Sequence, residues 1–350
     1  MIEKLEKWKN HKFKDVYLLG AGSSLAYGYP TGSQLKINLI NLENGTDNIF
    51  NQLRKNIDEC KDDDLQHHLG EFSIELKSFV EKLKKSGAQS IDSFVAKNPR
   101  YLNIAKFLVS YVLINCARTA GNTVDGIFEP SVDCKPWILN YLNKRIGLDY
   151  SGYLEEPDCF ITFNYDLHLE DCFTNYYSHQ EIDRDLASRA KHIVRNDLPI
   201  FHVYGNLERV NAVLNALRDD TVPGFDDLIL ASEGINFIDR KHKDEYKVLR
   251  SILQNAERLI ILGYGFDPDN NDIIFGGLKG LQEDFLTLKI ISTCKGLTDA
   301  EVDKFKKMRL AETIVQHAEL LSMTTEMHDK DCNQLLMDHI LVRKFFNDEI

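Results

Sequence analysis

The sequence predicts an α/β protein built on a Rossmann-like parallel sheet with a large helical insertion. Short apolar runs recur along the 350 residues, and stretches with helical spacing separate them, which is the pattern of a sheet covered on both faces. The first run leads directly into a glycine turn, as in nucleotide-binding sheets. The runs predicted as strands are Val16–Gly20, Cys159–Phe163, Ile200–Val203, Leu228–Ala231, Leu259–Leu262 and Leu288–Ser292.

The first glycine turn predicts a phosphate site. Gly20 and Gly22 have no Cβ that would keep a diphosphate away from the backbone. The amides of Gly22, Ser23 and Ser24 are expected to meet the anion at the start of a helix. The third glycine of the dinucleotide fingerprint does not follow, so the alternative is a turn that only lets helix and strand pack closely.

A long helical interval, residues 34–150, separates the first two predicted strands. It is too long for one crossover connection, so it is interpreted as a helical subdomain inserted into the sheet. The predicted domains are residues 1–33 with 151–315 for the nucleotide-binding sheet, 34–150 for the insertion and 316–350 for a C-terminal helical tail. The tail is expected to pack on the sheet or on another subunit.

Charge and cysteine usage exclude several classes of protein. The net charge of −12 and the pI near 5.4 argue against binding nucleic acid through its phosphates. No window is apolar enough for a membrane span and the N-terminus is too charged for a secretory signal, so a cytoplasmic location is expected. The seven cysteines are scattered singly, and His67-His68 is interpreted as part of a polar turn, so no metal is expected.

Three later segments place polar or glycine residues at the ends of predicted strands. Asn164 follows the second strand, His202 lies near the end of the third, and Gly263-Tyr264-Gly265 forms a second glycine turn. Because the carboxyl ends of parallel strands meet at one edge, these residues are expected to face one ligand. Each also has a plain structural alternative: a turn, a hydrogen-bonded core histidine and a packing turn. The acceptors after the second glycine turn are Asp267, Asn270 and Asn271.

At these motifs the chain resembles the sirtuin family, and more closely the sirtuin-like domains of bacterial antiphage defence that destroy NAD. Gly20-Ala21-Gly22-Ser23-Ser24 with Gly28-Tyr29-Pro30 is similar to the family's phosphate and nicotinamide loop. Thr162–Asp166 is similar to its Thr-Gln-Asn-x-Asp motif, and His202–Gly205 falls where its His-Gly pair belongs. Ser90–Phe94 resembles a short Ile-Asp-x-Phe element of the defence branch. The resemblance spans about residues 16–300.

Three departures from the family's pattern shape the functional expectation. Tyr204 stands immediately before the glycine, and His202 lies two residues upstream, on the same face of the strand. Thr31-Gly32 replaces the acid-arginine pair of deacylating sirtuins, and the zinc ribbon with its Cys-x-x-Cys pairs is missing. Deacylation is therefore disfavoured.

The mechanism is predicted from the bond that breaks. Nicotinamide leaves readily while oxocarbenium charge develops on the ribose, so catalysis rests on orientation and on a placed water. The Asn164 amide is expected to hold a ribose hydroxyl and the water, with His202 as general base. Asp166 either orients a partner or caps the next helix. The residues assigned to NAD binding are Gly20, Ala21, Gly22, Ser23, Ser24, Pro30, Asp92, Phe163, Asp166, Tyr204, Gly205, Gly263, Tyr264, Gly265, Asp267 and Asn270.

The predicted function is NAD+ hydrolysis that releases nicotinamide and ADP-ribose, with NAD as substrate. The resemblance implies the NAD-depleting effector of an antiphage defence system, activated by assembly into an oligomer or by a partner protein. The alternatives are an NAD or ADP-ribose sensor without turnover, and an NAD-dependent deacylase or ADP-ribosyl transferase. No basic residue is clearly placed for a 2′-phosphate, so NAD and NADP are not distinguished.

Overall fold

A computed structural model describes residues 2–42, 51, 55, 58, 63–88, 90–121, 136–147, 150–178, 184–207, 225–237, 243–275, 288–303 and 325–341. These residues pack as two compact units. One unit, residues 1–27, 129–203 and 240–350, contains the sheet, and the other, residues 28–128 and 204–239, is mainly helical.

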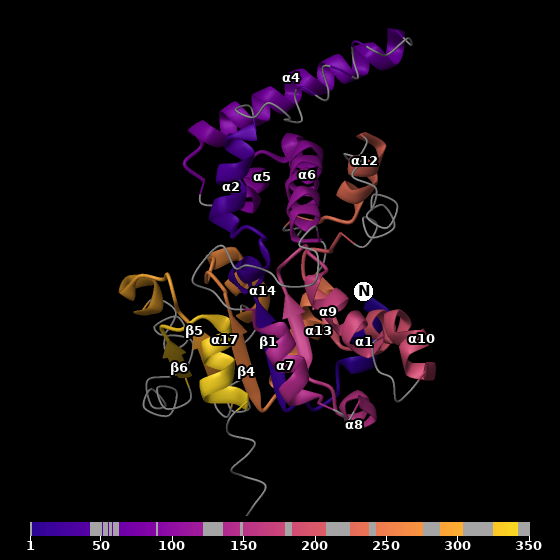
Figure 1. The fold of residues 1–350 in the computed structure, drawn as a ribbon. Coiled ribbons are helices and arrows are strands. Elements are labelled where there is room, and N and C mark those ends of the chain that lie inside the picture. Colours follow the sequence, from indigo (N-terminus) through magenta and orange to yellow (C-terminus); the bar gives the residue numbers. More distant parts are fainter. Residues whose placement is uncertain are drawn as a thin grey trace, which may run out of the picture. The chain divides into compact units, whose positions relative to one another are not determined.

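The sheet is parallel throughout and has six strands in the order β3-β2-β1-β4-β5-β6 (Figure 1). This α/β, Rossmann-like architecture confirms the predicted fold class. Leu19 pairs with Thr162, and Thr162 with His202, so the carboxyl ends of three adjacent strands meet at one edge. The strands are β1 Asp15–Leu19, β2 Cys159–Thr162, β3 Ile200–His202, β4 Arg258–Leu262, β5 Lys289–Thr293 and β6 Thr325–His328.

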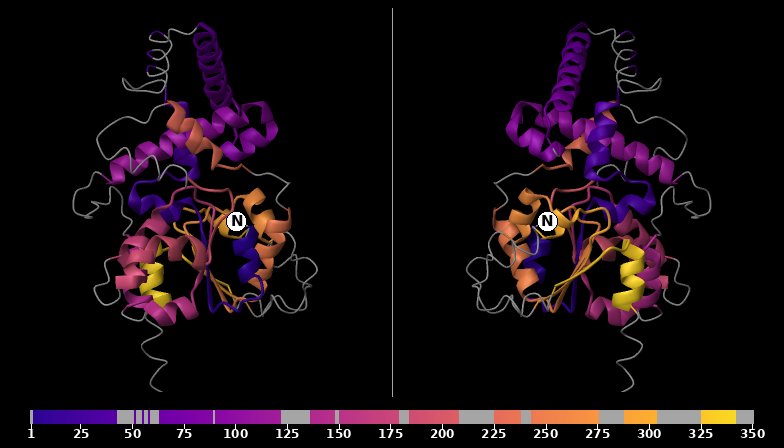
Figure 2. Two further views of the ribbon diagram at one scale, coloured as in Figure 1. Left: turned by 90° about the vertical axis from the view of Figure 1, so that its right-hand side faces the viewer. Right: turned by 90° about the vertical axis from the view of Figure 1, so that its left-hand side faces the viewer.

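Helices cover both faces of this sheet, as the two views of Figure 2 show. On one face lie α1 (Ile2–Trp8), α13 (Lys243–Gln254) and α14 (Pro268–Phe275). On the other lie α7 (Ile138–Arg145), α9 (His168–Ser178) and α17 (Cys332–Leu335), which continues into η8 (Leu336–Leu341). The same unit contains α8 (Tyr150–Glu155), α10 (Arg184–His192) and η4 (Ile193–Asp197).

The strands of the sheet form the core because they are apolar on both faces. All residues of β1, β2 and β3 are buried, and in β4 and β5 only the first residue is partly exposed. The guanidinium of Arg258 donates to both carboxylate oxygens of Asp15, at 2.5 and 2.6 Å, and so joins the starts of β4 and β1. This bidentate ion pair at the amino ends of β1 and β4 therefore supports the register that aligns the carboxyl ends of the strands.

The second unit is built from helices around a core of its own. Thr31 begins α2 with a capping box. The Thr31 hydroxyl accepts the Gln34 backbone amide, and the Gln34 side chain accepts the Thr31 backbone amide. A second capping box, formed by Ser90 and Ser93, begins α5. The helices of this unit are α2 (Gly32–Ile40), α4 (Asp63–Lys85), α5 (Ile91–Lys97), η3 (Pro99–Tyr101), α6 (Leu102–Gly121) and α12 (Phe225–Glu233).

Two element predictions are wrong. The predicted strand Leu228–Ala231 is part of helix α12: Leu228 and Ala231, three residues apart, are buried, while Ile229 and Leu230 are exposed. A short apolar run does not distinguish these alternatives by periodicity alone. In the predicted helical tail, residues 325–328 form the edge strand β6, whose partly exposed Thr-Glu-Met-His sequence lacks the apolar signature of a buried strand. The domain boundaries themselves stay a prediction.

None of the helices in the described residues is long and apolar enough to cross a membrane.

Candidate functional site

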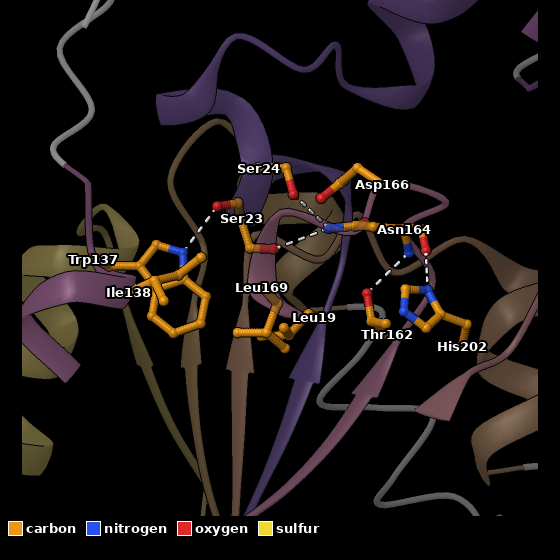
Figure 3. Close-up of a pocket in the computed structure, with 10 residues that line it drawn as sticks. All are labelled: Leu19, Ser23, Ser24, Trp137, Ile138, Thr162, Asn164, Asp166, Leu169 and His202. Carbon is orange, nitrogen blue, oxygen red and sulfur yellow. Dashed lines mark hydrogen bonds between the residues drawn. The ribbon is translucent and has the colours of Figure 1, made fainter. Parts of the chain in front are cut away.

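A small cavity lies at the carboxyl ends of β1, β2 and β3, in the unit that contains the sheet (Figure 3). The space within it is about 260 Å³ including the part open to solvent, but the lining atoms leave room for only about one water molecule. The cavity therefore has room for one small group of a larger ligand. Its lining residues are Leu19, Ser23, Ser24, Trp137, Ile138, Thr162, Asn164, Asp166, Leu169 and His202.

Asn164 is held on three sides at this cavity. Its Nδ2 donates to Ser24 Oγ at 2.9 Å and to Ser23 Oγ at 3.2 Å, and its backbone amide donates to Thr162 Oγ1 at 3.0 Å (Figure 3). Its Oδ1 atom is buried and has no hydrogen-bond partner within the described part of the chain. A buried acceptor without a partner is costly, so this oxygen is available to a ligand hydroxyl or a water.

His202 connects Asn164 to an acid that the sequence analysis missed. Its Nδ1 donates to the Asn164 backbone carbonyl at 2.7 Å, and its Nε2 donates to Glu170 Oε1 at 2.6 Å. Burial alone would lower the pKa of His202, but the Glu170 carboxylate and the Asn164 carbonyl outweigh it, and the pKa is raised. Burial would raise the pKa of Glu170, but the His202 charge and hydrogen bond outweigh it, and that pKa is lowered. The two residues form a buried ion pair.

This ion pair changes the role expected of His202. Both ring nitrogens carry a proton and donate it to an acceptor, so the imidazolium has no lone pair with which to act as a general base in this arrangement. Its direct effect is to hold the main chain at Asn164. The only sequence signal for Glu170 is an acidic residue in the first turn of α9, which is common because it complements the helix dipole.

The two glycine turns pack against each other. A Cβ on Gly20 would lie 2.6 Å from the Gly263 carbonyl oxygen, and one on Gly263, whose φ is +59°, would lie 2.1 Å from the Ser23 amide nitrogen. The Gly22 amide donates to the Gly263 carbonyl and the Ser23 amide to the Gly20 carbonyl, each at 2.9 Å. Both amides therefore have backbone acceptors in this arrangement: Gly22 serves the close packing that was the alternative, and Ser23 closes the first turn on itself. Their binding to phosphate stays a prediction.

A sequence comparison covers two of the three strand ends just described, those of β2 and β3. Residues 158–289 match the family model for a SIR2-like domain. The match begins at the start of β2 and ends at the start of β5, so it includes Asn164, Glu170 and His202 and supports an NAD-related function. No curated protein matches the chain.

Two aspartates of the matched region accept backbone amides at the start of a helix, and Asp267 does so as the N-cap of α14. Asp166 Oδ1 accepts the His168 amide at 3.2 Å, and Asp267 Oδ1 accepts the amides of Asp269 at 3.0 Å and Asn270 at 3.3 Å. Asp166 also lines the cavity. Burial raises its pKa, although a hydrogen bond from Ser24 opposes the shift. Asp166 thus makes a local bond at the start of α9, as its capping alternative predicts, while its part in NAD binding stays a prediction. The acceptor capacity of Asp267 is partly used within its own turn.

The turn after β4 contributes aromatic residues to the SIR2-like domain. The rings of Phe163 and Tyr264 lie 5.4 Å apart, and Tyr264 Oη is buried without a hydrogen-bond partner among the described residues. Phe266 has φ of +51°, an unusual conformation for a bulky residue. A Cβ on Gly265 would meet nothing within 4 Å, so this glycine, unlike Gly263, leaves space beside the backbone.

The structure brings together only part of the predicted site. Ser23, Ser24, Asn164, Asp166 and His202 line one cavity. Four other predicted residues belong to the helical unit: Pro30, Asp92, Tyr204 and Gly205. Their part in NAD binding stays a prediction.

Proposed function

We propose that this chain is an NAD+ glycohydrolase, which uses water to cleave the bond between nicotinamide and ribose and releases ADP-ribose. The observation that supports this most is the Asn164 amide at the strand ends of the SIR2-like domain, with its donor satisfied by two serines and its buried acceptor unpartnered. An acceptor at a fixed position holds a ribose hydroxyl or the attacking water in register. The small cavity is the proposed place for the attacking water or one ribose hydroxyl, and the rest of the dinucleotide lies outside it.

The proposed roles divide between binding and positioning. Asn164 touches the substrate, and His202 with Glu170 fixes the backbone that carries it. Water attack on the ribose carbon breaks the bond to the nicotinamide nitrogen, whose positive charge is neutralised by the bonding electrons, and the water loses one proton. Among the described residues that line the cavity, only His202 and Asp166 have ionisable side chains, so the Asp166 carboxylate is the proposed acceptor of that proton. For His202 to act as the base, it would first have to leave Glu170.

The decisive experiment is incubation of the purified protein with NAD+ and chromatography of the products. Nicotinamide and ADP-ribose are expected in equal amounts, and Asn164→Ala is expected to lower kcat about 100-fold or more, as does loss of a positioned hydrogen-bonding group in other enzymes. Asn196→Ala, at an exposed asparagine of the same unit, is the matched control. A wild-type protein that binds NAD+ and never releases nicotinamide, alone or concentrated, would overturn the proposal.

Within this proposal the biological role is NAD depletion in antiphage defence, switched on by assembly or by a partner protein. The resemblance of the four motifs to the defence branch of the sirtuin-like domains supports this role. Unchecked NAD hydrolysis would kill the host cell, so activity must depend on a signal. Turnover per subunit is expected to rise with protein concentration or with an added partner; full activity of a dilute monomer would argue against this control.

A sensor that binds NAD or ADP-ribose without turnover is the second candidate. The engaged imidazolium of His202 favours it, because the free base expected at that position is lacking. Calorimetry with ADP-ribose and chromatography of NAD+ together separate the two. A sensor binds ADP-ribose and leaves NAD+ intact, whereas a hydrolase converts NAD+ to ADP-ribose. A deacylase or ADP-ribosyl transferase would instead transfer the labelled ADP-ribose or remove acyl groups from a peptide.

A further inference from the structure

A cluster of potential metal ligands lies at the edge strand β6 of the sheet. Glu326 and His328 are two residues apart on β6 and share a face of that strand, and His339 comes from η8. One ligand atom from each of the three side chains lies within 4.8 Å of the others. Glu326 Oε2 and His328 Nε2 are 3.4 Å apart, which is close to the separation of two ligands that share one metal ion at about 2.1 Å each.

The cluster already attracts positive charge. Lys330 Nζ donates to His339 Nε2 at 2.8 Å, so this ring nitrogen presents a lone pair, as a metal ligand must. Lys289 Nζ pairs with Glu326 Oε1 at 2.7 Å. The ammonium group of Lys330 has a second partner, Asp338 Oδ2 at 2.9 Å, to which it can turn when it leaves the imidazole.

We propose that Glu326, His328 and His339 bind one divalent transition-metal ion of the zinc type, which takes the place of the Lys330 ammonium at His339. Two imidazoles and one carboxylate form a ligand set that suits such an ion. The side chains of Glu326 and His328 are 29% and 22% exposed, so water reaches the cluster and completes the coordination.

This site is separate from the cavity at Asn164. Strands β1, β4 and β5 lie between β2 and β6 in the sheet, so the metal does not meet the proposed substrate. It instead joins the edge strand β6 to η8. The linear sequence gives no hint of the cluster, because His328 and His339 do not have the close spacing of familiar zinc motifs.

The test is titration of the purified, metal-free chain with Zn²⁺ against a chromophoric competitor, with Co²⁺ absorption to identify the ligands. One ion is expected per chain, with a cobalt spectrum that lacks thiolate bands. His339→Ala is expected to weaken binding at least about tenfold. Lys330→Met removes the competing ammonium and is expected to tighten binding several-fold, an effect that misfolding would not produce.

The matched control is the double variant His67→Ala with His68→Ala, which is expected to leave the affinity unchanged. This exposed histidine pair lies on α4 and not in the polar turn predicted for it. Three results would overturn the proposal: no saturable binding by the wild-type chain, binding that survives both His328→Ala and His339→Ala, or a thiolate band in the cobalt spectrum. Weaker binding in Lys330→Met would overturn the claim that lysine and metal compete. None of these measurements depends on NAD turnover.

Discussion

Glu170 and His202 form a buried ion pair with 2.6 Å between Oε1 and Nε2, and the other ring nitrogen of His202 donates to the Asn164 backbone carbonyl. The side chains are 14% and 6% exposed, so water screens this pair weakly. An imidazolium with a donor on each nitrogen is a fixed link between helix α9 and the end of β2. The position of the Asn164 amide therefore depends on a carboxylate that does not line the cavity.

Glu170→Gln tests this dependence in the proposed reaction. The amide removes the negative charge that favours imidazolium, so the pKa of His202 is expected to fall, as measured by NMR titration of its ring. The kcat for NAD+ is expected to drop about 10- to 100-fold, because a misplacement of about 1 Å in a reacting group is enough for such a loss. Glu155→Gln, at an exposed glutamate of the same unit, is the control. An unchanged kcat with a lowered pKa would show that the ion pair serves stability alone.

The pair also predicts how stability depends on pH. The pKa of Glu170 is lowered by folding, so its contribution is present above its ordinary value of 4.5 and is lost as pH falls through the folded pKa. The pKa of His202 is raised, so its contribution is present below 6.5 and is lost as pH rises through the folded pKa. The free energy of unfolding in urea should therefore carry the pair's full contribution between these values. In the double variant Glu170→Gln with His202→Gln, the loss of stability below and above this pH range should disappear. A pH dependence equal to that of the wild type would contradict the assignment.

The contact between the glycine turns predicts a strong contrast between two neighbouring positions. Gly263→Ala places a methyl group 2.1 Å from the Ser23 amide nitrogen at a positive φ, and is expected to lower the free energy of unfolding by about 2–4 kcal/mol. Gly265→Ala meets no atom within 4 Å and should change it by less than about 1 kcal/mol. Urea denaturation measures both. Equal effects would mean that the turns do not pack as described.

Asp267 permits a separation of capping from substrate binding. Asp267→Ala removes the acceptor for two amides at the start of α14 and is expected to cost about 1 kcal/mol of stability. Asp267→Asn keeps a good capping side chain and should retain that stability. A raised KM for NAD+ in the Asn variant, with unchanged stability, would support the predicted contact with the nucleotide. An unchanged KM would leave the residue with its capping role alone.

Much of the fold follows from local sequence. Apolar runs long enough for a strand and bounded by polar residues predict β1 to β5 within a residue or two, because burial on both faces leaves a continuous apolar signature. The polar β6 at the sheet edge escapes this test, and the apolar run in α12 mimics it. Both errors arise where an element is only partly buried.

The sequence by itself determined that this chain folds as a parallel α/β sheet and that Asn164 and His202 stand at the ends of two of its strands, because the strand pattern is a local property. That these two strands are neighbours was decided by the tertiary structure. Only the tertiary structure decided what those groups meet. It pairs His202 with Glu170, uses the amides of Gly22 and Ser23 for backbone packing, and gathers Glu326, His328 and His339. The physical reason is that a polar group acts through its nearest partners. The partners that matter here, Glu170 for His202, Gly263 for Gly22 and His339 for the two ligands on β6, come from elements distant in the chain.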